Sequence, residues 1–411
     1  MIMDIKNNVK KLFGDSVLSI IGIVFMNAVA QFAIYPFWER TFGTERYGTI
    51  VFLLSMMNIA ALTFGPAANY TRIMISARHE TRNAPYTLLM FLYGGVTAVY
   101  ALIVALLDKS ALTPLDIAGY VVLSVLTSWR AYADVEYRIH LNYKGFCLYY
   151  VLIGAGYGLG VFIMLHAGTF TAALIPGEII GLLYVALFGH IFKPDSFERS
   201  DVPEIAGMFG VLAGSYFINT LIFNADRILI RAAIGDTAVS VYYIASLFGK
   251  TLSLVTTPFN GVVSGYLARI KGVPARRYRV LTVAGGAGLA LLAAVGCTLG
   301  AHIVLPYLYK DTFDLAKDKF FICSLAQTIY FSSNLLSTFM LRFAAKKHQM
   351  ISEILYAAAF MALGILAAFL GGMEVFCPAL VAVSGARFVY ICIVLIKANS
   401  DNNDITAKAE V

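Results

Sequence analysis

Twelve long apolar segments follow one another along the chain of 411 residues and constrain its fold more than any other feature. Each has about 20 residues or more, the length that an α-helix needs to cross the hydrocarbon core of a bilayer. The segments lie near residues 14–36, 47–70, 85–107, 115–137, 146–165, 172–192, 205–225, 241–267, 280–304, 319–341, 351–371 and 376–397. Because they are continuous rather than alternating, they predict an all-α integral membrane protein with about 12 transmembrane helices.

The composition excludes a soluble globular protein. Hydrophobic residues make up 59% of the chain and charged residues only 13%, whereas soluble domains have about 25% charged residues. The net charge of +7 is explained by basic cytoplasmic loops, so no nucleic-acid partner is expected. The five cysteines lie in or beside apolar runs without a CxxC spacing, which predicts neither disulfides nor a metal cluster.

The basic residues are unequally divided between the two sides of the membrane. With a cytoplasmic N-terminus, 20 of the 31 Lys and Arg residues fall in inside segments and 8 in outside segments. This asymmetry predicts that both ends of the chain are cytoplasmic. Ala28-Val29-Ala30 imitates a signal-peptide cleavage site, but the apolar run continues to Trp38, so we expect no cleavage.

The second half of the chain repeats features of the first half in the same order. Phe42-Gly43-Thr44-Glu45 opens the second segment, and Ile234-Gly235-Asp236-Thr237 opens the eighth, 192 residues later. Six segments per half is an even number, so the halves share one orientation. The repeat predicts two parallel six-helix bundles, residues 1–195 and 196–411, with a cleft between them.

Two motifs carry a resemblance to a known family. Residues 41–48 (TFGTERYG) resemble the opening of the second span in polysaccharide-exporting members of the MOP superfamily. Residues 224–230 (NADRILI) and 234–242 (IGDTAVSVY) resemble the block that joins spans seven and eight in that family, although no glycine directly precedes Tyr242. The chain thus resembles Wzx-type flippases of lipid-linked O-antigen repeat units, which belong to the polysaccharide transporter family.

The resemblance implies a MATE-like pair of six-helix bundles in the bacterial inner membrane. It implies that the protein flips an undecaprenyl-diphosphate-linked oligosaccharide, an O-antigen or similar surface polysaccharide unit, to the periplasmic leaflet by alternating access. Its implied partners are that glycan and membrane lipids, with a polysaccharide polymerase and a chain-length regulator acting afterwards. No nucleotide, metal-ligand or nucleophile motif occurs, so no enzyme activity and no cofactor are expected, while coupling to protons or sodium stays open.

Three basic residues within the spans are candidates for binding the diphosphate. A charge at the centre of a span costs about 2.5–3.5 kcal/mol, so each needs a partner or a ligand. Arg387 lies at the middle of span twelve, Lys250 lies in span eight and Arg130 in span four. For Arg387 the alternative is a structural pair with a buried carboxylate such as Glu353 or Glu178.

Four further charged residues are candidates for coupling or for charge pairs. Asp134 follows Arg130 by four residues, so the two share a helix face and form a predicted pair. Glu178 is a candidate for binding a coupling cation, and Asp226 and Arg227 form a predicted interface pair or cap at the outer end of span seven.

Prolines and glycines mark hinges and close contacts. Pro66 and Pro258 occupy matching positions in the two halves and are predicted hinges, because a proline frees a backbone carbonyl within a helix. The alternating glycines Gly154, Gly156, Gly158 and Gly160 contain overlapping GxxxG patterns, which favour close helix packing over nucleotide binding.

Two other functions remain as alternatives. A drug or cation exporter of the same superfamily would need an acidic cavity, whereas basic intramembrane residues are at least as prominent here. A glycan polymerase or ligase is disfavoured because no predicted outside loop is long enough for a catalytic domain.

Overall fold

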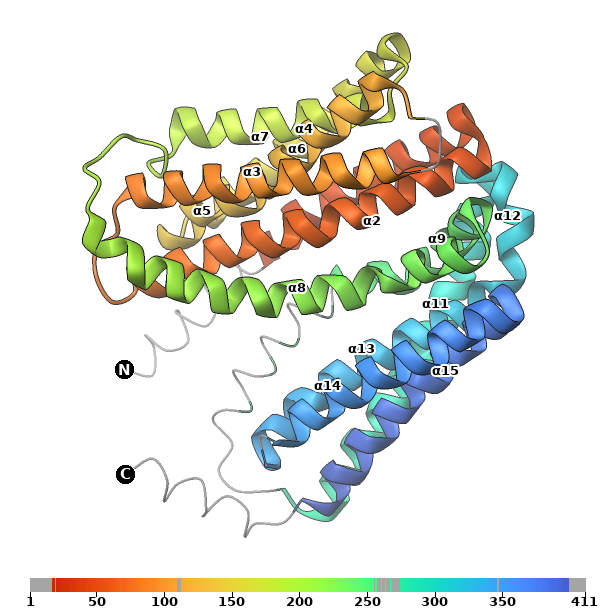
Figure 1. The fold of residues 1–411 in the computed structure, drawn as a ribbon. Helices are drawn as coiled ribbons and strands as arrows, with labels where there is room; N and C mark the ends of the chain where they lie inside the picture. Colours follow the sequence, from red (N-terminus) through yellow and green to blue (C-terminus); the bar gives the residue numbers. More distant parts are fainter. Residues whose placement is uncertain are drawn as a thin grey trace. The chain divides into compact units, whose positions relative to one another are not determined.

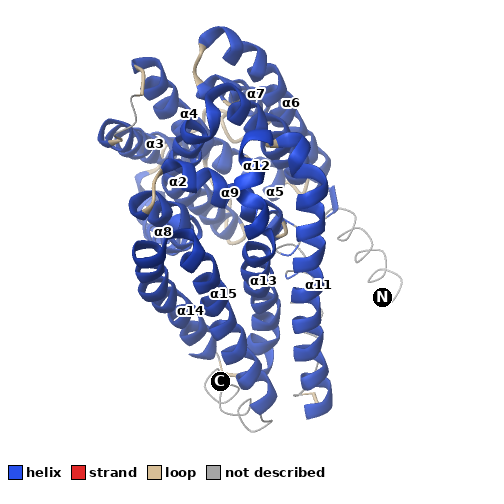
Figure 2. Ribbon diagram, turned by 90° about the vertical axis from the view of Figure 1, so that its right-hand side faces the viewer, coloured by secondary structure: helices blue, strands red, loops and turns tan. Residues whose placement is uncertain are grey.

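The computed structural model describes residues 17, 18, 20–108, 112–254, 274–345 and 347–398, together with the single residues 256, 260, 263 and 267. Every regular element among these residues is helical, as Figure 2 shows. The chain divides into two compact units, Met1–Ile228 and Leu229–Val411 (Figure 1).

The first unit is built from a long N-terminal helical run and six further helices. The run covers residues 20–76 and includes a π-helical turn at Ala30–Ile34. The labelled helices are α2 (Tyr35–Ser76), α3 (Asn83–Leu107), α4 (Pro114–Ala133), α5 (Val135–Ile139), α6 (Tyr143–Ala167), α7 (Ile175–Phe188) and α8 (Val202–Ala233).

In the second unit, α13 (Phe320–Phe343) packs side by side with two other long helices, α11 (Arg276–Leu308) and α15 (Ile365–Lys397) (Figure 1). The helices of this unit are α9 (Asp236–Thr251), α11 (Arg276–Leu308), α12 (Lys310–Ala316), α13 (Phe320–Phe343), α14 (Lys347–Ala359) and α15 (Ile365–Lys397). A π-helical turn, Phe360–Gly364, joins α14 to α15.

Two glycines divide the longest helical runs into pieces that each match one predicted span. Gly43 has φ 80° within α2, and Gly372 has φ 58° within α15. L-residues with a side chain rarely adopt these angles, so glycine permits a sharp break at each point. The breaks fall between predicted spans one and two and between spans eleven and twelve.

Six helical runs in the described residues are long and apolar enough to cross a membrane. Two of them, residues 20–76 and 347–397, are the runs that Gly43 and Gly372 divide. α4 and α13 coincide with predicted spans but are more polar, since α13 alone buries Ser324, Thr328, Ser332, Ser333 and Ser337. Predicted span eight is helical from Asp236 to Thr251, and most of its second half lies outside the described residues.

The predicted domain boundary at 195/196 differs from the division of the structure after Ile228. The difference is α8, whose side chains contact α2 in the first unit. Thr220 Oγ1 lies 3.0 Å from Thr63 Oγ1, and the ring of Tyr216 lies 6.0 Å from that of Tyr70. The assignment of this helix to the second bundle therefore stays a prediction.

The start of α4 shows how the sequence specifies a helix boundary. Pro114 occupies the first helical turn, and Thr113 and Asp116 form a reciprocal capping box that satisfies two otherwise unpaired N–H groups. The buried Asp116 also accepts hydrogen bonds from Arg46 on α2 (3.1 Å) and from Thr169 (2.7 Å). One carboxylate thus ties the N-terminus of α4 to two other segments.

The glycines of α6 permit close packing against α7, as the GxxxG patterns predicted. A Cβ added at Gly156 would lie 2.5 Å from Gly177 Cα, and one at Gly160 would lie 2.2 Å from the carbonyl oxygen of Ala173. Gly158 faces the other way, with no atom within 4 Å of its added Cβ. The contact at Gly156 brings its neighbour Tyr157 within 2.7 Å of Glu178 on α7.

Gly156→Ala is expected to lower the free energy of unfolding by about 1–3 kcal/mol, because the new methyl group would force α6 and α7 apart. Gly158→Ala is the matched control, since it lies two residues away on the same helix and has open space beside it. It should leave stability unchanged or raise it by up to about 1 kcal/mol. Thermal unfolding of both purified proteins in detergent measures the difference, and equal melting temperatures would contradict the packing described above.

Candidate functional site

A buried ion pair joins α4 to α7 inside the first unit. Arg130 Nε lies 2.7 Å from Glu178 Oε2, and the side chains are 10% and 2% exposed. The hydroxyl of Tyr157 donates to the other carboxylate oxygen at 2.7 Å, and the hydroxyl of Tyr149 donates to the carbonyl of Arg130 at 3.0 Å. Both charges are therefore compensated within the unit.

Asp134 forms a second polar centre one turn along α4. Its carboxylate accepts hydrogen bonds from Arg138 (3.1 Å to each oxygen), from the hydroxyl of Tyr150 (2.8 Å) and from the amide of Asn69. The predicted pairing of Arg130 with Asp134 is thus wrong. Arg130 pairs with Glu178, and Asp134 instead pairs with Arg138, which follows it by four residues.

Asp226 and Arg227 lie within α8 and are 5% and 8% exposed. The prediction placed them at the outer end of a span, but α8 continues to Ala233. The Arg227 guanidinium donates to Ser55 Oγ on α2 at 2.9 Å and contacts Asn224 Oδ1 at 3.4 Å. Arg227 therefore joins α8 to α2 within the first unit rather than capping a helix end.

A polar cluster surrounds Arg387 in the second unit, where α13, α14 and α15 meet. Arg387 is only 1% exposed. Its guanidinium donates to Asn334 Oδ1 at 2.7 Å and pairs with Glu353 Oε1 at 2.5 Å. Glu353, in contrast, has a side chain that is 48% exposed. The alternative named from the sequence, a pair between Arg387 and Glu353, is present.

Aromatic rings complete the Arg387 cluster. The guanidinium carbon lies 5.0 Å from the ring centroid of Tyr330 and 5.6 Å from that of Tyr356, within the range of cation–π attraction. The Nε atom of Arg387 is buried and has no hydrogen-bond partner among the described residues. The cluster therefore contains a buried guanidinium, one guanidinium N–H without a hydrogen-bond acceptor among the described residues, and the half-exposed carboxylate of Glu353.

Lys250 lies at the end of α9, half-buried, with its Nζ atom 5.7 Å from the ring centroid of Tyr242. Pro66 lies inside α2. The residue before it, Gly65, lies close to α4, because a Cβ added there would be 2.4 Å from the carbonyl oxygen of Ser128. Pro258 lies outside the described residues. The structure places Arg130 in the first unit, and Lys250 and Arg387 in the second.

Two polar residues, one of them in the Arg387 cluster, were not singled out from the sequence. Gln349 on α14 donates to Glu353 at 3.1 Å and accepts from Ser337 on α13, so it extends the Arg387 cluster. Glu39 is fully buried in α2, although it lies between the predicted spans 14–36 and 47–70. In the sequence, both residues are marked only as a carboxylate or an amide next to an apolar run. That feature does not indicate which residue they contact.

The sequence itself matches no protein-family model and no curated protein. Solved structures do match. An outward-facing multidrug resistance MATE family transporter of the MOP superfamily is 14% identical, with 97% of this chain and 96% of that chain covered and a TM-score of 0.64. An inward-facing one is 11% identical, with 95% and 99% covered and a TM-score of 0.63.

A lipid II flippase, MurJ, in an inward closed conformation matches as well. It is 11% identical, with 94% of this chain and 86% of that chain covered and a TM-score of 0.56. At such low identities the likeness shows the fold alone. The predicted fold class is confirmed: the described residues have the all-helical fold of these MATE and MurJ structures. Six of the described helical runs are also long and apolar enough to cross a membrane.

Proposed function

We propose that this protein is a flippase that moves an undecaprenyl-diphosphate-linked oligosaccharide from the cytoplasmic to the periplasmic leaflet of the bacterial inner membrane. The observation that carries the proposal is the Arg387 cluster, in which a buried guanidinium is paired with a half-exposed carboxylate. Support comes from the sequence motifs that resemble polysaccharide exporters and from the fold shared with a lipid II flippase.

The chemistry of the cluster suits a diphosphate. A guanidinium can bind two phosphate oxygens through parallel N–H donors, a geometry that lysine lacks. Glu353 is 48% exposed, so a phosphate oxygen could replace its carboxylate at the guanidinium without the carboxylate becoming buried and unpaired. Tyr330, Asn334 and Gln349 would remain as neutral partners for sugar hydroxyls.

The first unit has a different part in the proposal. Arg130, which was predicted to bind the diphosphate, is paired with Glu178. Glu178 is 2% exposed, so its carboxylate would have no access to water if a phosphate took its place at Arg130. A coupling proton or sodium ion would first have to displace Arg130 from Glu178. We therefore assign diphosphate binding mainly to Arg387 and Lys250, and conformational coupling to Arg130, Glu178 and Asp134.

The distribution of basic residues supports an inner-membrane protein with both ends in the cytoplasm. The flipped unit would then be used by a polysaccharide polymerase and a chain-length regulator in the periplasm. No catalytic step is assigned to the flippase itself.

A multidrug exporter is the second candidate function, and the higher TM-scores of the MATE transporters favour it. Cation export requires a carboxylate that can accept the cation. Here Glu178 is paired with Arg130 and Asp134 with Arg138, so neither carboxylate is uncompensated. The pairing of these two carboxylates with arginines thus argues for an anionic rather than a cationic substrate.

Deletion of the gene tests the proposal directly. We expect single lipid-linked repeat units to accumulate in the cytoplasmic leaflet, inaccessible to a glycan-modifying enzyme added from outside, and the cell surface to lose the polymer. Re-expression of the wild-type chain is the control. Accessible single units on the periplasmic leaflet would indicate a polymerase or ligase, and unchanged lipid-linked glycans with increased drug sensitivity would indicate the exporter.

A further inference from the structure

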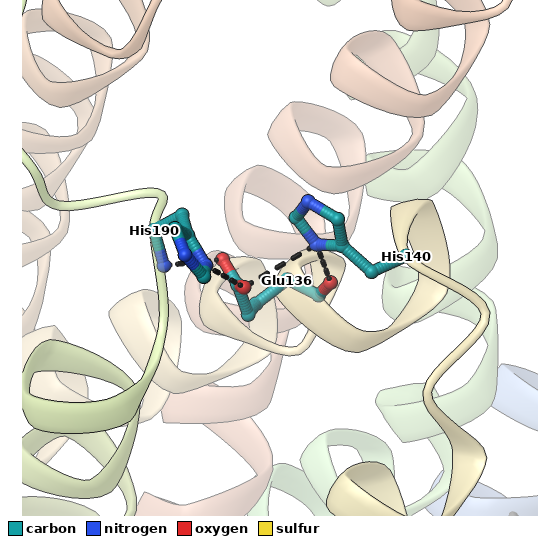
Figure 3. A group of neighbouring side chains, drawn as sticks. All are labelled: Glu136, His140 and His190. Atoms are coloured by element: carbon teal, nitrogen blue, oxygen red, sulfur yellow. Dashed lines mark hydrogen bonds and ion pairs between the residues drawn. The ribbon is translucent and has the colours of Figure 1, made fainter.

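Three side chains that could ligate a metal ion meet at the end of the first unit where α5 lies next to the segment after α7. They are Glu136 on α5, His140 directly after α5, and His190 two residues after the end of α7 (Figure 3). Their ligand atoms all lie within 4.8 Å of one another. The sequence predicted no metal cluster, because His190 is 54 residues from Glu136 along the chain.

The carboxylate of Glu136 is oriented by the backbone of the opposite segment. Its Oε2 atom accepts the backbone N–H groups of His190 (2.9 Å) and Ile191 (3.0 Å). Gly189 permits this approach, since a Cβ added there would lie 3.1 Å from the Glu136 carboxyl carbon. Oε2 is thereby occupied, and Oε1 is directed at the two histidine rings, as Figure 3 shows.

The two distances from Oε1 to the histidine nitrogens match two edges of a tetrahedral zinc site. Oε1 lies 3.3 Å from His140 Nδ1 and 3.2 Å from His190 Nδ1. Ligands bound to zinc at about 2.0–2.1 Å are about 3.3–3.4 Å apart along the edges of a tetrahedron. Two histidines and one carboxylate are also a ligand set that zinc uses, with water in the fourth position.

Access and the contacts around the ligands are consistent with metal binding. The histidine side chains are 52% and 63% exposed, whereas Glu136 is 7% exposed, so an ion can enter from the aqueous side. The carbonyl of His190 accepts from Asn83 Nδ2 at 2.9 Å, which fixes its backbone from the other direction. Such outer contacts hold metal ligands in position and are a regular part of metal sites. His140 Nδ1 also contacts the Glu136 carbonyl at 2.7 Å and would exchange that contact for the metal.

From this arrangement we propose that Glu136, His140 and His190 form a binding site for Zn²⁺. The ion binds Oε1 of Glu136 and one nitrogen of each histidine. A histidine that is protonated on both nitrogens releases the proton of the nitrogen that binds zinc, and the other nitrogen keeps its proton. Occupancy links α5 to the beginning of the segment 189–201, which leads into α8. Zinc in solution therefore stabilises this end of the first unit.

The test uses the full chain purified in detergent, treated with a chelator and then titrated with Zn²⁺ alone. We expect about one tightly bound zinc per chain by elemental analysis after gel filtration, and a higher melting temperature with zinc than with chelator. The variant H140A/H190A should bind zinc at least about 100-fold more weakly and lose the thermal shift. Both side chains are exposed, so this variant is expected to fold, and its melting temperature in chelator checks that.

A matched variant separates this site from adventitious binding by the other histidines and cysteines. The variant H166A/H302A also removes two exposed histidines. Like His140, each has its Nδ1 atom in contact with the carbonyl four residues earlier, at 2.9 Å in both cases. This variant should keep the bound zinc. Cobalt substituted for zinc should give visible absorption bands of a low-coordinate site in the wild type and in the matched variant only. Absence of tight zinc in the wild type, or equal loss in both double variants, would overturn the proposal.

Discussion

Arg130→Ala is expected to lower the free energy of unfolding by about 3–5 kcal/mol, because it would leave Glu178 charged and buried without its cationic partner. Glu178 is 2% exposed, so water cannot replace the guanidinium. The remaining partner, the hydroxyl of Tyr157, is neutral. The measurement is the melting temperature of the purified protein, together with the amount of folded protein in the membrane.

Two further variants show whether this loss comes from the ion pair. Removing both charges in R130L/E178L should restore most of the stability, since apolar residues of similar size often replace a buried pair without cost. Arg78→Ala is the control, because Arg78 pairs with Glu204 at 3.6 Å with both side chains largely exposed, and such pairs contribute about 0–1 kcal/mol. If R130L/E178L folds but does not export, the pair serves transport as well. An Arg130→Ala variant as stable as the wild type would show that the Glu178 carboxylate does not need the charge of Arg130.

The helices could be predicted from the sequence because an apolar run of span length has only one means of satisfying its backbone in lipid. Even the breaks at Gly43 and Gly372 fall where two predicted spans meet. The ends were less predictable. α8 continues past the predicted end of its span, and this places Asp226 and Arg227 inside the helix. Helix length depends on packing as well as on apolar content, and packing is not visible in one sequence.

Partners of the charged residues were predictable only where they lie on the same helix or where few candidates exist. Asp134 has two arginines at helical spacing, and the sequence could not show which of them turns toward it. The pair of Arg387 and Glu353 was among the alternatives because few carboxylates occur within spans. The group of Glu136, His140 and His190 could not be foreseen, since α6 and α7 separate its members in the sequence.

Arg387→Ala is expected to reduce glycan export at least about 10-fold for each folded molecule in the membrane. A hydrogen bond between charged groups contributes about 1.5–3 kcal/mol, which corresponds to about 10–100-fold in binding. Lys250→Ala should also reduce export, because it removes the second cation of the same unit. Arg387→Lys should keep part of the activity, since the charge remains although the planar fork is lost.

Glu353→Gln separates a binding role of Arg387 from a structural one. If the diphosphate replaces the Glu353 carboxylate during transport, the neutral amide of this variant removes a charged competitor, and export should stay near the wild-type rate. Arg387 would keep its contacts with Asn334 and with the rings of Tyr330 and Tyr356 but would lose its charged partner, so E353Q should fold with a lower free energy of unfolding. Export is therefore compared for each folded molecule in the membrane. If Arg387 only stabilises the fold through Glu353, then E353Q and R387A should lower the amount of folded protein to a similar extent and leave export per molecule unchanged. Normal export per molecule in the Arg387→Ala variant would therefore refute the proposed binding site, whatever its effect on protein amount.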